Sequence, residues 1–244
     1  MGTEFIIPDW SAPSNVHARI TTRLGGISLP PYGTFNLGNH VGDDVDAVVW
    51  NRAILRKELP AEPFWLNQVH GNEIGDADSP VFQSTADGAV CRTPGKVLAI
   101  MMADCLPVLL CTRDGSVLGV AHAGWRGLCA GVIENTLLKM RVSPDTVLAY
   151  LGPAIGPGFF EVGPEVRQAF VQSDERAMHA FVPAKSGKKW LGNLYELARQ
   201  RLVAAGVSNI SGGEFCTYRD ESLFFSYRRD GRTGRQAALL WRVC

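Results

Sequence analysis

Cysteine and histidine side chains stand at three places in this sequence where a run of apolar residues ends. Cys105 follows one such run, His122 closes the next, and His70 closes the stretch FWLNQVHG. One thiolate and two imidazoles form a zinc shell with an open fourth position, which is typical of a catalytic zinc site. The wide spacing matches no zinc-finger rule. The same residues also suit a Cys–His nucleophile pair, as in a thiol hydrolase.

A basic, glycine-rich corner follows His122. The residues Ala-Gly-Trp-Arg-Gly come directly after it, and a helix is expected to begin there. Small residues let a ligand approach the backbone closely, and the free N–H groups at the start of a helix attract anions. Arg126 adds a positive charge, so we expect this corner to hold phosphate. Trp125 is more simply interpreted as a core residue than as a platform for a base.

Asp104 precedes Cys105 in the segment MMADCLP, where a proline interrupts regular strand pairing. A carboxylate at such a break acts as a general acid or base, or it orients a metal ligand from behind. The sequence leaves both roles open, and both place Asp104 in the candidate site.

Alternating and continuous apolar runs predict the elements that must position these residues. Asp43 or Asp44 can begin a helix that runs to about Leu59, and Asn193 with Glu196 is a cap pair for another. Pro164 is suited to the first turn of a helix. Strands are expected at residues 16–22, 64–71, 97–103, 107–112, 117–121 and 146–151, helices at 128–140 and 194–205, and a C-terminal hairpin from 223–228 and 236–243.

Strands and helices alternate without strict βαβ order, so we expect one α+β domain over residues 1–244, with mixed sheets and helices outside. The chain carries 24 basic and 24 acidic residues, which gives no electrostatic case for nucleic acid or an anionic membrane as partner. No leader or membrane-spanning run is evident. Six scattered cysteines without a C-x-x-C pair favour a reduced, cytoplasmic setting.

Several motifs, in order, resemble the YfiH-type family, whose members are also called laccase-domain proteins and peptidoglycan editing factors. They are TTRLGG near the N-terminus, then QVHG, MMADCLP, AHAGWRG, YLGPAIGP, and FFSYRRDG followed by TGR. The resemblance covers nearly the whole chain. It implies a four-layer α/β/β/α sandwich and a zinc ion bound by His70, Cys105 and His122.

The resemblance also implies a reaction and further site residues. Members act as purine nucleoside phosphorylases on adenosine, inosine and methylthioadenosine, and adenosine deaminase activity is attributed to them as well. The expected partners are therefore a purine nucleoside and phosphate. By the same resemblance, Arg23, Asn36 and Arg52 are expected around the pocket as substrate-binding residues.

Other functions stay open at this stage. A polyphenol oxidase would need many histidines in His-x-His pairs, whereas this chain has five histidines and no such pair, so zinc is preferred over copper. The family name and the Cys–His pair also suggest an amide hydrolase that corrects peptidoglycan precursors carrying serine. A non-catalytic protein with a structural zinc is a further alternative, and it would need a fourth protein ligand. The sequence indicates no particular oligomeric state.

Overall fold

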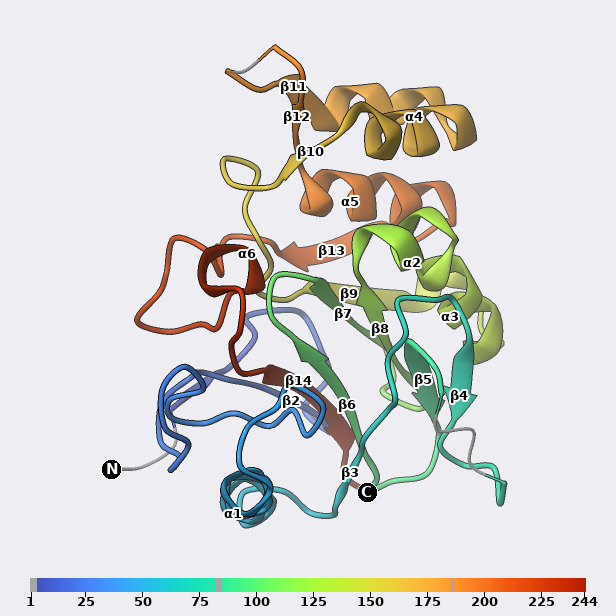
Figure 1. Ribbon diagram of the computed structural model, residues 1–244. Helices are drawn as coiled ribbons and strands as arrows, with labels where there is room; N and C mark the ends of the chain where they lie inside the picture. The colour runs from blue at the N-terminus through green and yellow to red at the C-terminus, as the bar shows by residue number, and fades with distance from the viewer. Residues whose placement is uncertain (1–3, 82–84, 186) are drawn as a thin grey trace.

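The computed structural model describes residues 4–81, 85–185 and 187–244, and three β-sheets organise this part of the chain (Figure 1). The first sheet has the order β1 (Phe5–Ile6), β2 (Val16–Thr21), β14 (Gln236–Arg242), β6 (Val97–Met102) and β3 (Pro63–Phe64). The second has the order β13 (Asn209–Gly212), β9 (Val147–Leu151), β7 (Leu106–Thr112), β8 (Leu118–Ala123), β5 (Gly88–Cys91) and β4 (Ile74–Asp76). A small third sheet joins β10 (Glu161–Val162), β12 (Trp190–Gly192) and β11 (Phe181–Pro183).

The two larger sheets pack against each other through one face of each. Leu98 and Ile100 of β6 share a buried cluster with Leu109 of β7 and Tyr150 of β9. Because successive side chains of a strand point to opposite faces, the neighbouring residues of β6 must face the other way. The interior between the sheets is apolar, and the continuous hydrophobic runs in the sequence arise because β6, β7 and β8 are buried on both faces.

Helices cover the two outer faces. Val97 and Ala99 of β6 lie in a second cluster with Leu55 of α1 (Val45–Arg56). On the far side, Val108 of β7 lies in a third cluster with Ile133 of α3 (Val132–Met140) and with residues of α5 (Leu194–Ala204). The order helix, sheet, sheet, helix confirms the expected four-layer α/β/β/α architecture.

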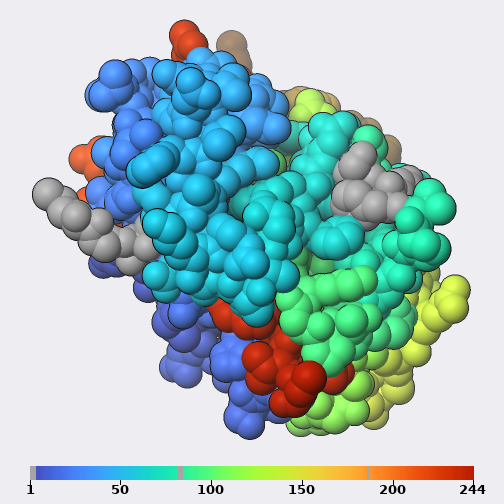
Figure 2. Space-filling view, turned by 90° about the horizontal axis from the view of Figure 1, so that it is seen from below, coloured from blue at the N-terminus to red at the C-terminus, as the bar shows by residue number. Residues whose placement is uncertain are grey.

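β14, the last strand, lies beside β2, which comes early in the chain. It lies antiparallel between β2 and β6, so that Leu240 pairs with Ala18 on one side and with Leu98 on the other. Seen from below, the red C-terminal end reaches the surface beside green residues, while blue to cyan segments cover much of this face (Figure 2). Almost the full length of the chain is thus needed to complete the first sheet.

Three of the predicted helix starts are confirmed. The Asp44 side chain accepts a hydrogen bond from the Asp46 N–H at the start of α1, and Asn193 accepts one from the Glu196 N–H at the start of α5. Pro164 begins α4 (Pro164–Ser173). The single helix expected over 128–140 is wrong, because Gly131, at a φ of 89°, separates α2 (Trp125–Cys129) from α3. Short 3₁₀ segments lie at Pro144–Thr146 and Glu175–Ala180.

Two predicted strands are largely absent from the described residues. Of 64–71, only Phe64 lies in a strand; instead, the Gln68 amide donates to the Met101 carbonyl and accepts from the Met101 N–H, both at 2.8 Å. Residues 223–228 form no hairpin with β14, and the short helix α6 (Tyr227–Asp230) stands there instead. In both segments, side chains hold the backbone where a strand ladder was expected. No helix in the described part of the chain is long and apolar enough to cross a bilayer.

Candidate functional site

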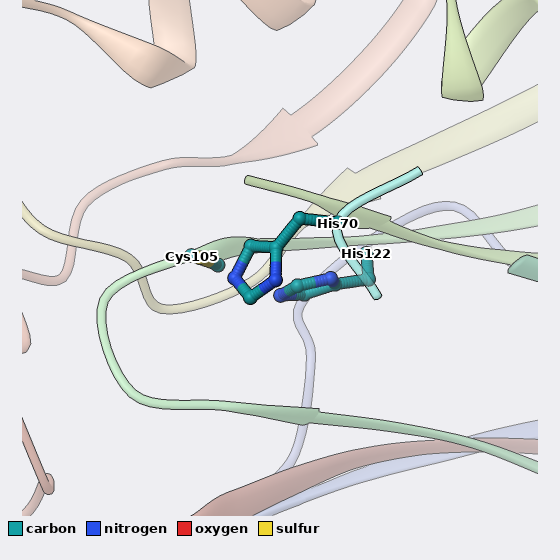
Figure 3. Close-up of side chains that lie close together, drawn as sticks. All are labelled: His70, Cys105 and His122. Atoms are coloured by element: carbon teal, nitrogen blue, oxygen red, sulfur yellow. The ribbon is translucent and has the colours of Figure 1, made fainter. Parts of the chain in front are cut away.

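His70, Cys105 and His122 meet at one end of the second sheet (Figure 3). One potential ligand atom from each residue lies within 4.8 Å of the others. The two imidazole rings are 4.8 Å apart between centroids, with an angle of 71° between their planes. His70 is exposed, Cys105 is half-buried and His122 is buried. The cluster is therefore accessible from one side, as an open metal site must be.

A turn between β6 and β7 presents Cys105. Asp104 stands in this turn at a φ of 90°, a value that a non-glycine residue rarely adopts. Its carboxylate accepts two hydrogen bonds of 2.6 Å, one from the Thr217 hydroxyl and one from the Arg228 N–H. These two partners lie far along the chain, so the C-terminal region fixes the turn that carries the thiol.

A buried carboxylate, Asp87, positions both histidines. Its oxygens accept hydrogen bonds from the backbone N–H groups of Val69, His70 and Gly71 at 2.7 to 3.0 Å. Its Oδ1 also lies 2.8 Å from His122 Nδ1. With Nδ1 engaged in this way, Nε2 of His122 is the nitrogen left for a metal ion. A carboxylate commonly orients a histidine ligand by bonding to its other ring nitrogen.

Electrostatics favour the ionised form of Cys105. Burial alone would raise the pKa of its thiol, but the His122 and His70 imidazoles lower that pKa to about 6. Burial lowers the pKa of His122, while the Cys105 thiolate and the Asp87 carboxylate together raise it above its usual range. The thiolate and the imidazolium therefore stabilise each other. A thiolate is the form of cysteine that binds metals and acts as a nucleophile.

The donor set fits a metal ion. One sulfur and two nitrogens converge from three separate segments, and Gly124 leaves room for them. A Cβ atom added at Gly124 would stand 2.9 Å from Cys105 Sγ and 3.1 Å from His70 Cδ2. Soft thiolate with imidazole is a donor set that suits zinc or copper. The cluster is thus a candidate metal centre with three protein ligands.

The candidate centre opens into a cavity of about 520 Å³. One part of the wall is apolar or aromatic and includes Trp125, Ile155, Phe160 and Leu194. The charged part of the wall consists of Asp104, Arg126, Arg228 and Arg235, with His40 beside them. Cavities of this kind suit small molecules that combine a flat apolar body with an anionic or polar group.

The structure separates the expected site residues into two groups. Asp104 and Arg126 line the cavity with the three candidate ligands, whereas Arg23, Asn36 and Arg52 are not among the lining residues. Arg23 donates to the carbonyls of Gly33 and Glu221, and Arg52 lies 4.3 Å over the Trp65 ring. Asn36 is fully buried. A substrate-binding role for these three stays a prediction.

Sequence reasoning missed several residues of the site. Asp87 precedes a glycine and gives no signal of its own, because its partners are dispersed along the chain. Gln68 lies in the motif QVHG, and Arg228 and Arg235 lie in the motifs near the C-terminus, but nothing in the sequence distinguished them from surface residues. His40 belongs to a long loop, a kind of segment that often contributes to function.

The fold and the cluster define a class of four-layer α/β proteins with a candidate His–Cys–His metal centre at the strand ends. A family model described as multi-copper polyphenol oxidoreductase laccase matches residues 17–243, and the chain belongs to this family. The resemblance to YfiH-type proteins is confirmed by relatives of nearly equal length.

These relatives include proteins that are named for an enzymatic activity. The chain is 50% identical to purine nucleoside phosphorylase YfiH of Escherichia coli (strain K12), covering 99% of this chain and 100% of that one. It is 46% identical to a purine nucleoside phosphorylase of Haemophilus influenzae, covering 97% and 98% of the two chains.

Solved structures agree with the fold. A Neisseria meningitidis protein of the family model DUF152 superposes with a TM-score of 0.94 at 46% identity, covering 98% of this chain and 99% of that one. The hypothetical protein YfiH of Bacillus licheniformis superposes with a TM-score of 0.86 at 31% identity, covering 93% and 92%.

Proposed function

We propose that this chain is a zinc-dependent purine nucleoside phosphorylase that acts on adenosine, inosine and methylthioadenosine. The observation that carries the proposal is the juxtaposition of a three-ligand centre with a cavity that has both an apolar wall and cationic side chains. The names of the E. coli and H. influenzae relatives support the same reaction class. We also propose that residues 1–244 act as one catalytic domain, because the cavity takes residues from His40 to Arg235.

The donor set supports zinc over copper. The cluster offers one thiolate and two imidazoles, a combination found in catalytic zinc sites. A multicopper oxidase needs several imidazole-rich sites, and the whole chain has five histidines. When bound, zinc supplies Lewis-acid polarisation of a substrate oxygen. His70, Cys105 and His122 would hold the ion.

Phosphorolysis breaks the bond between ribose C1′ and purine N9 while phosphate attacks C1′. The products are the free purine and ribose 1-phosphate. The apolar wall around Phe160 and Ile155 can enclose the purine and exclude water, while the arginines hold the phosphate in line. Asp104 contributes by holding the Cys105 turn, since its carboxylate already accepts two hydrogen bonds.

We further propose a side activity as an adenosine deaminase, in which water replaces the amino group of adenosine and ammonia is released. Product chromatography tests both activities. Zinc-loaded protein is incubated with adenosine, inosine or methylthioadenosine, with and without phosphate. Phosphate-dependent release of purine supports the phosphorylase. Equal release without phosphate would identify a nucleosidase, and the absence of ammonia from adenosine would remove the deaminase proposal.

A second candidate function rests on the closeness of Cys105 to His122, and the lowered pKa of the Cys105 thiol is consistent with it. A thiolate of this kind can attack the carbonyl carbon of an amide, and an adjacent imidazolium can protonate the departing amine. The substrate would be a peptidoglycan precursor that carries serine. Cleavage of that precursor, with an acyl group trapped on Cys105 and no purine released from nucleosides, would establish this function instead. If the zinc is only structural, the protein would convert neither the nucleosides nor the peptidoglycan precursor.

A further inference from the structure

Three arginines line the cavity, and the structure holds each in a different way. Arg126 is exposed, with its guanidinium 4.4 Å from the centre of the Trp125 ring. Arg228 is also exposed, and its Nη1 donates to the Glu161 carbonyl at 2.8 Å. Arg235 is half-buried. An anion that must be held in one orientation requires a cation whose own position is fixed.

Arg235 is held at several points and is the least exposed of the three. Its backbone N–H donates to Asn36 Oδ1 at 2.8 Å, and its Nη1 donates to the carbonyls of Thr233 and Gly234 at 3.1 and 3.0 Å. Its aliphatic stem packs on Gly38, where an added Cβ would stand 2.8 Å from Arg235 Cγ. The side chain is thus held at both its stem and its head.

The guanidinium keeps free hydrogen-bonding capacity. Within the part of the chain that the structure describes, Arg235 has no carboxylate within ion-pair distance, and its Nε and Nη2 have no hydrogen-bond partner. Guanidinium groups offer several N–H donors in a planar fork that matches an oxyanion. A fixed, half-buried cation that has no carboxylate partner among the described residues, and lies 6.0 Å from the centre of the Tyr227 ring, is therefore suited to an anionic ligand.

Asn36 connects this arginine with the loop that carries His40. The buried amide of Asn36 accepts from the Gly38 N–H at 2.9 Å and donates to the Gly38 carbonyl at 3.1 Å. Its Nδ2 also donates to Asp43 Oδ2 at 2.9 Å. The loop at residues 38–40 and the backbone of Arg235 are therefore one unit, and this unit brings His40 and Arg235 to the same wall.

We propose that Arg235, assisted by His40, forms the subsite for inorganic phosphate, and that Asn36 is the residue that positions this subsite. The inference rests on the proposed phosphorylase function. It differs from the sequence-based expectation, which gave phosphate to Arg126 at the corner after His122. Arg126 is exposed and stacks on its neighbour, and the helix that follows the corner has only five residues.

The location suits the reaction. Cys105 and Arg235 line the same cavity. Phosphate held by Arg235 would therefore share this cavity with the candidate metal centre. Ile155, Phe160 and Leu194 line the apolar part of the wall and remain free to enclose the purine.

Steady-state kinetics of the zinc-loaded enzyme test the assignment. Arg235→Met should raise the KM for phosphate by about ten- to a hundredfold, the usual effect of losing hydrogen bonds to a charged group. The KM for inosine should change less than about twofold, and Arg235→Lys should recover part of the loss because it keeps the charge. Arg232→Met is the matched control, since Arg232 stands on the same segment, also donates to a carbonyl and does not line the cavity.

Direct binding separates this inference from the proposed function. Calorimetric titration of the parent, Arg235→Met and Arg126→Met proteins with inorganic phosphate requires no turnover. Weakened binding in Arg235→Met alone supports the subsite, even if the parent releases no purine and the phosphorylase proposal fails. Weakened binding in Arg126→Met with unchanged binding in Arg235→Met would overturn it. Equal binding by all three folded proteins, as checked by thermal melts, would also overturn it.

Discussion

The Asp87 carboxylate lies 2.8 Å from His122 Nδ1, and both side chains are buried, at 0% and 3% exposure. The same carboxylate accepts the N–H groups of three consecutive residues around His70. Burial acts to raise the pKa of Asp87, but the bonds from His122 and from these N–H groups lower it overall. One ionised carboxylate therefore fixes two of the three candidate metal ligands.

Asp87→Asn should weaken metal binding. In the variant, an NH2 group replaces one carboxylate oxygen and cannot accept the hydrogen bonds that Asp87 now accepts. Both histidines would therefore lose their orientation. We expect metal affinity to fall about 10- to 100-fold, as measured by competition with a coloured chelator. Asp78→Asn is the control, because Asp78 also accepts a backbone N–H, from Arg92 at 2.6 Å, but lies outside the cluster. Equal losses of affinity in both variants would contradict the role of Asp87.

Elemental analysis should find close to one zinc per chain in the parent protein. Cys105→Ala should lose most of it, whereas Cys111→Ala, which removes a buried thiol from β7, should keep it. Zinc that persists in Cys105→Ala would show that the ion binds elsewhere.

His122→Ala should abolish activity and preserve the fold, because the cluster opens to a cavity and His122 belongs to none of the apolar core clusters. Thermal melts of the variant beside the zinc-loaded parent should show a cooperative transition in both proteins. A collapsed transition in the variant would instead identify a structural zinc, whose binding is part of the folding free energy.

The reactivity of Cys105 in the metal-free protein should depend on pH with a midpoint near 6, compared with about 8.5 for a free thiol. The rate should rise with pH. Above the midpoint the thiolate dominates and is alkylated quickly, whereas below it the thiol is protonated and reacts slowly. The rate of alkylation at Cys105, followed by mass spectrometry, measures this midpoint. His122→Ala should raise this midpoint, because burial raises the pKa of the thiol and the His122 imidazole would no longer oppose that effect. A midpoint that stays low in that variant would contradict the pairing.

Gly124→Ala should crowd the centre without breaking the backbone. Gly124 has a φ of −61° and a ψ of 156°, which alanine also adopts, but the new Cβ would stand 2.9 Å from Cys105 Sγ. We expect metal affinity to fall by about tenfold, or ~1.4 kcal/mol, at nearly unchanged thermal stability. Gly158→Ala is the control, because nothing lies within 4 Å of its added Cβ. Full metal affinity in Gly124→Ala would show that the ligands lie farther from this glycine.

The sequence by itself determined the features that depend on neighbouring residues. The cap at Asp44, the cap pair at Asn193 and the first-turn proline Pro164 are confirmed, because each is a bond or a restraint within one helical turn. The buried strands β6 to β9 were evident from their apolar runs. Residue types at strand ends also selected His70, Cys105 and His122, which the structure brings together; their role as metal ligands stays a prediction.

Only the tertiary structure decided the features that depend on distant partners. Residues 223–228 have the composition of a strand, but Asp104 holds the Arg228 N–H, and the Gln236 side chain holds the Phe225 N–H. Gly131 ended a helix whose apolar spacing continued past it. The positions of Asp87 and Arg235 depend on hydrogen bonds to residues that lie far away in the chain. The periodicity of apolar residues indicates which face of a helix or strand is buried. The partner of a polar side chain depends instead on how the sheets and helices pack together.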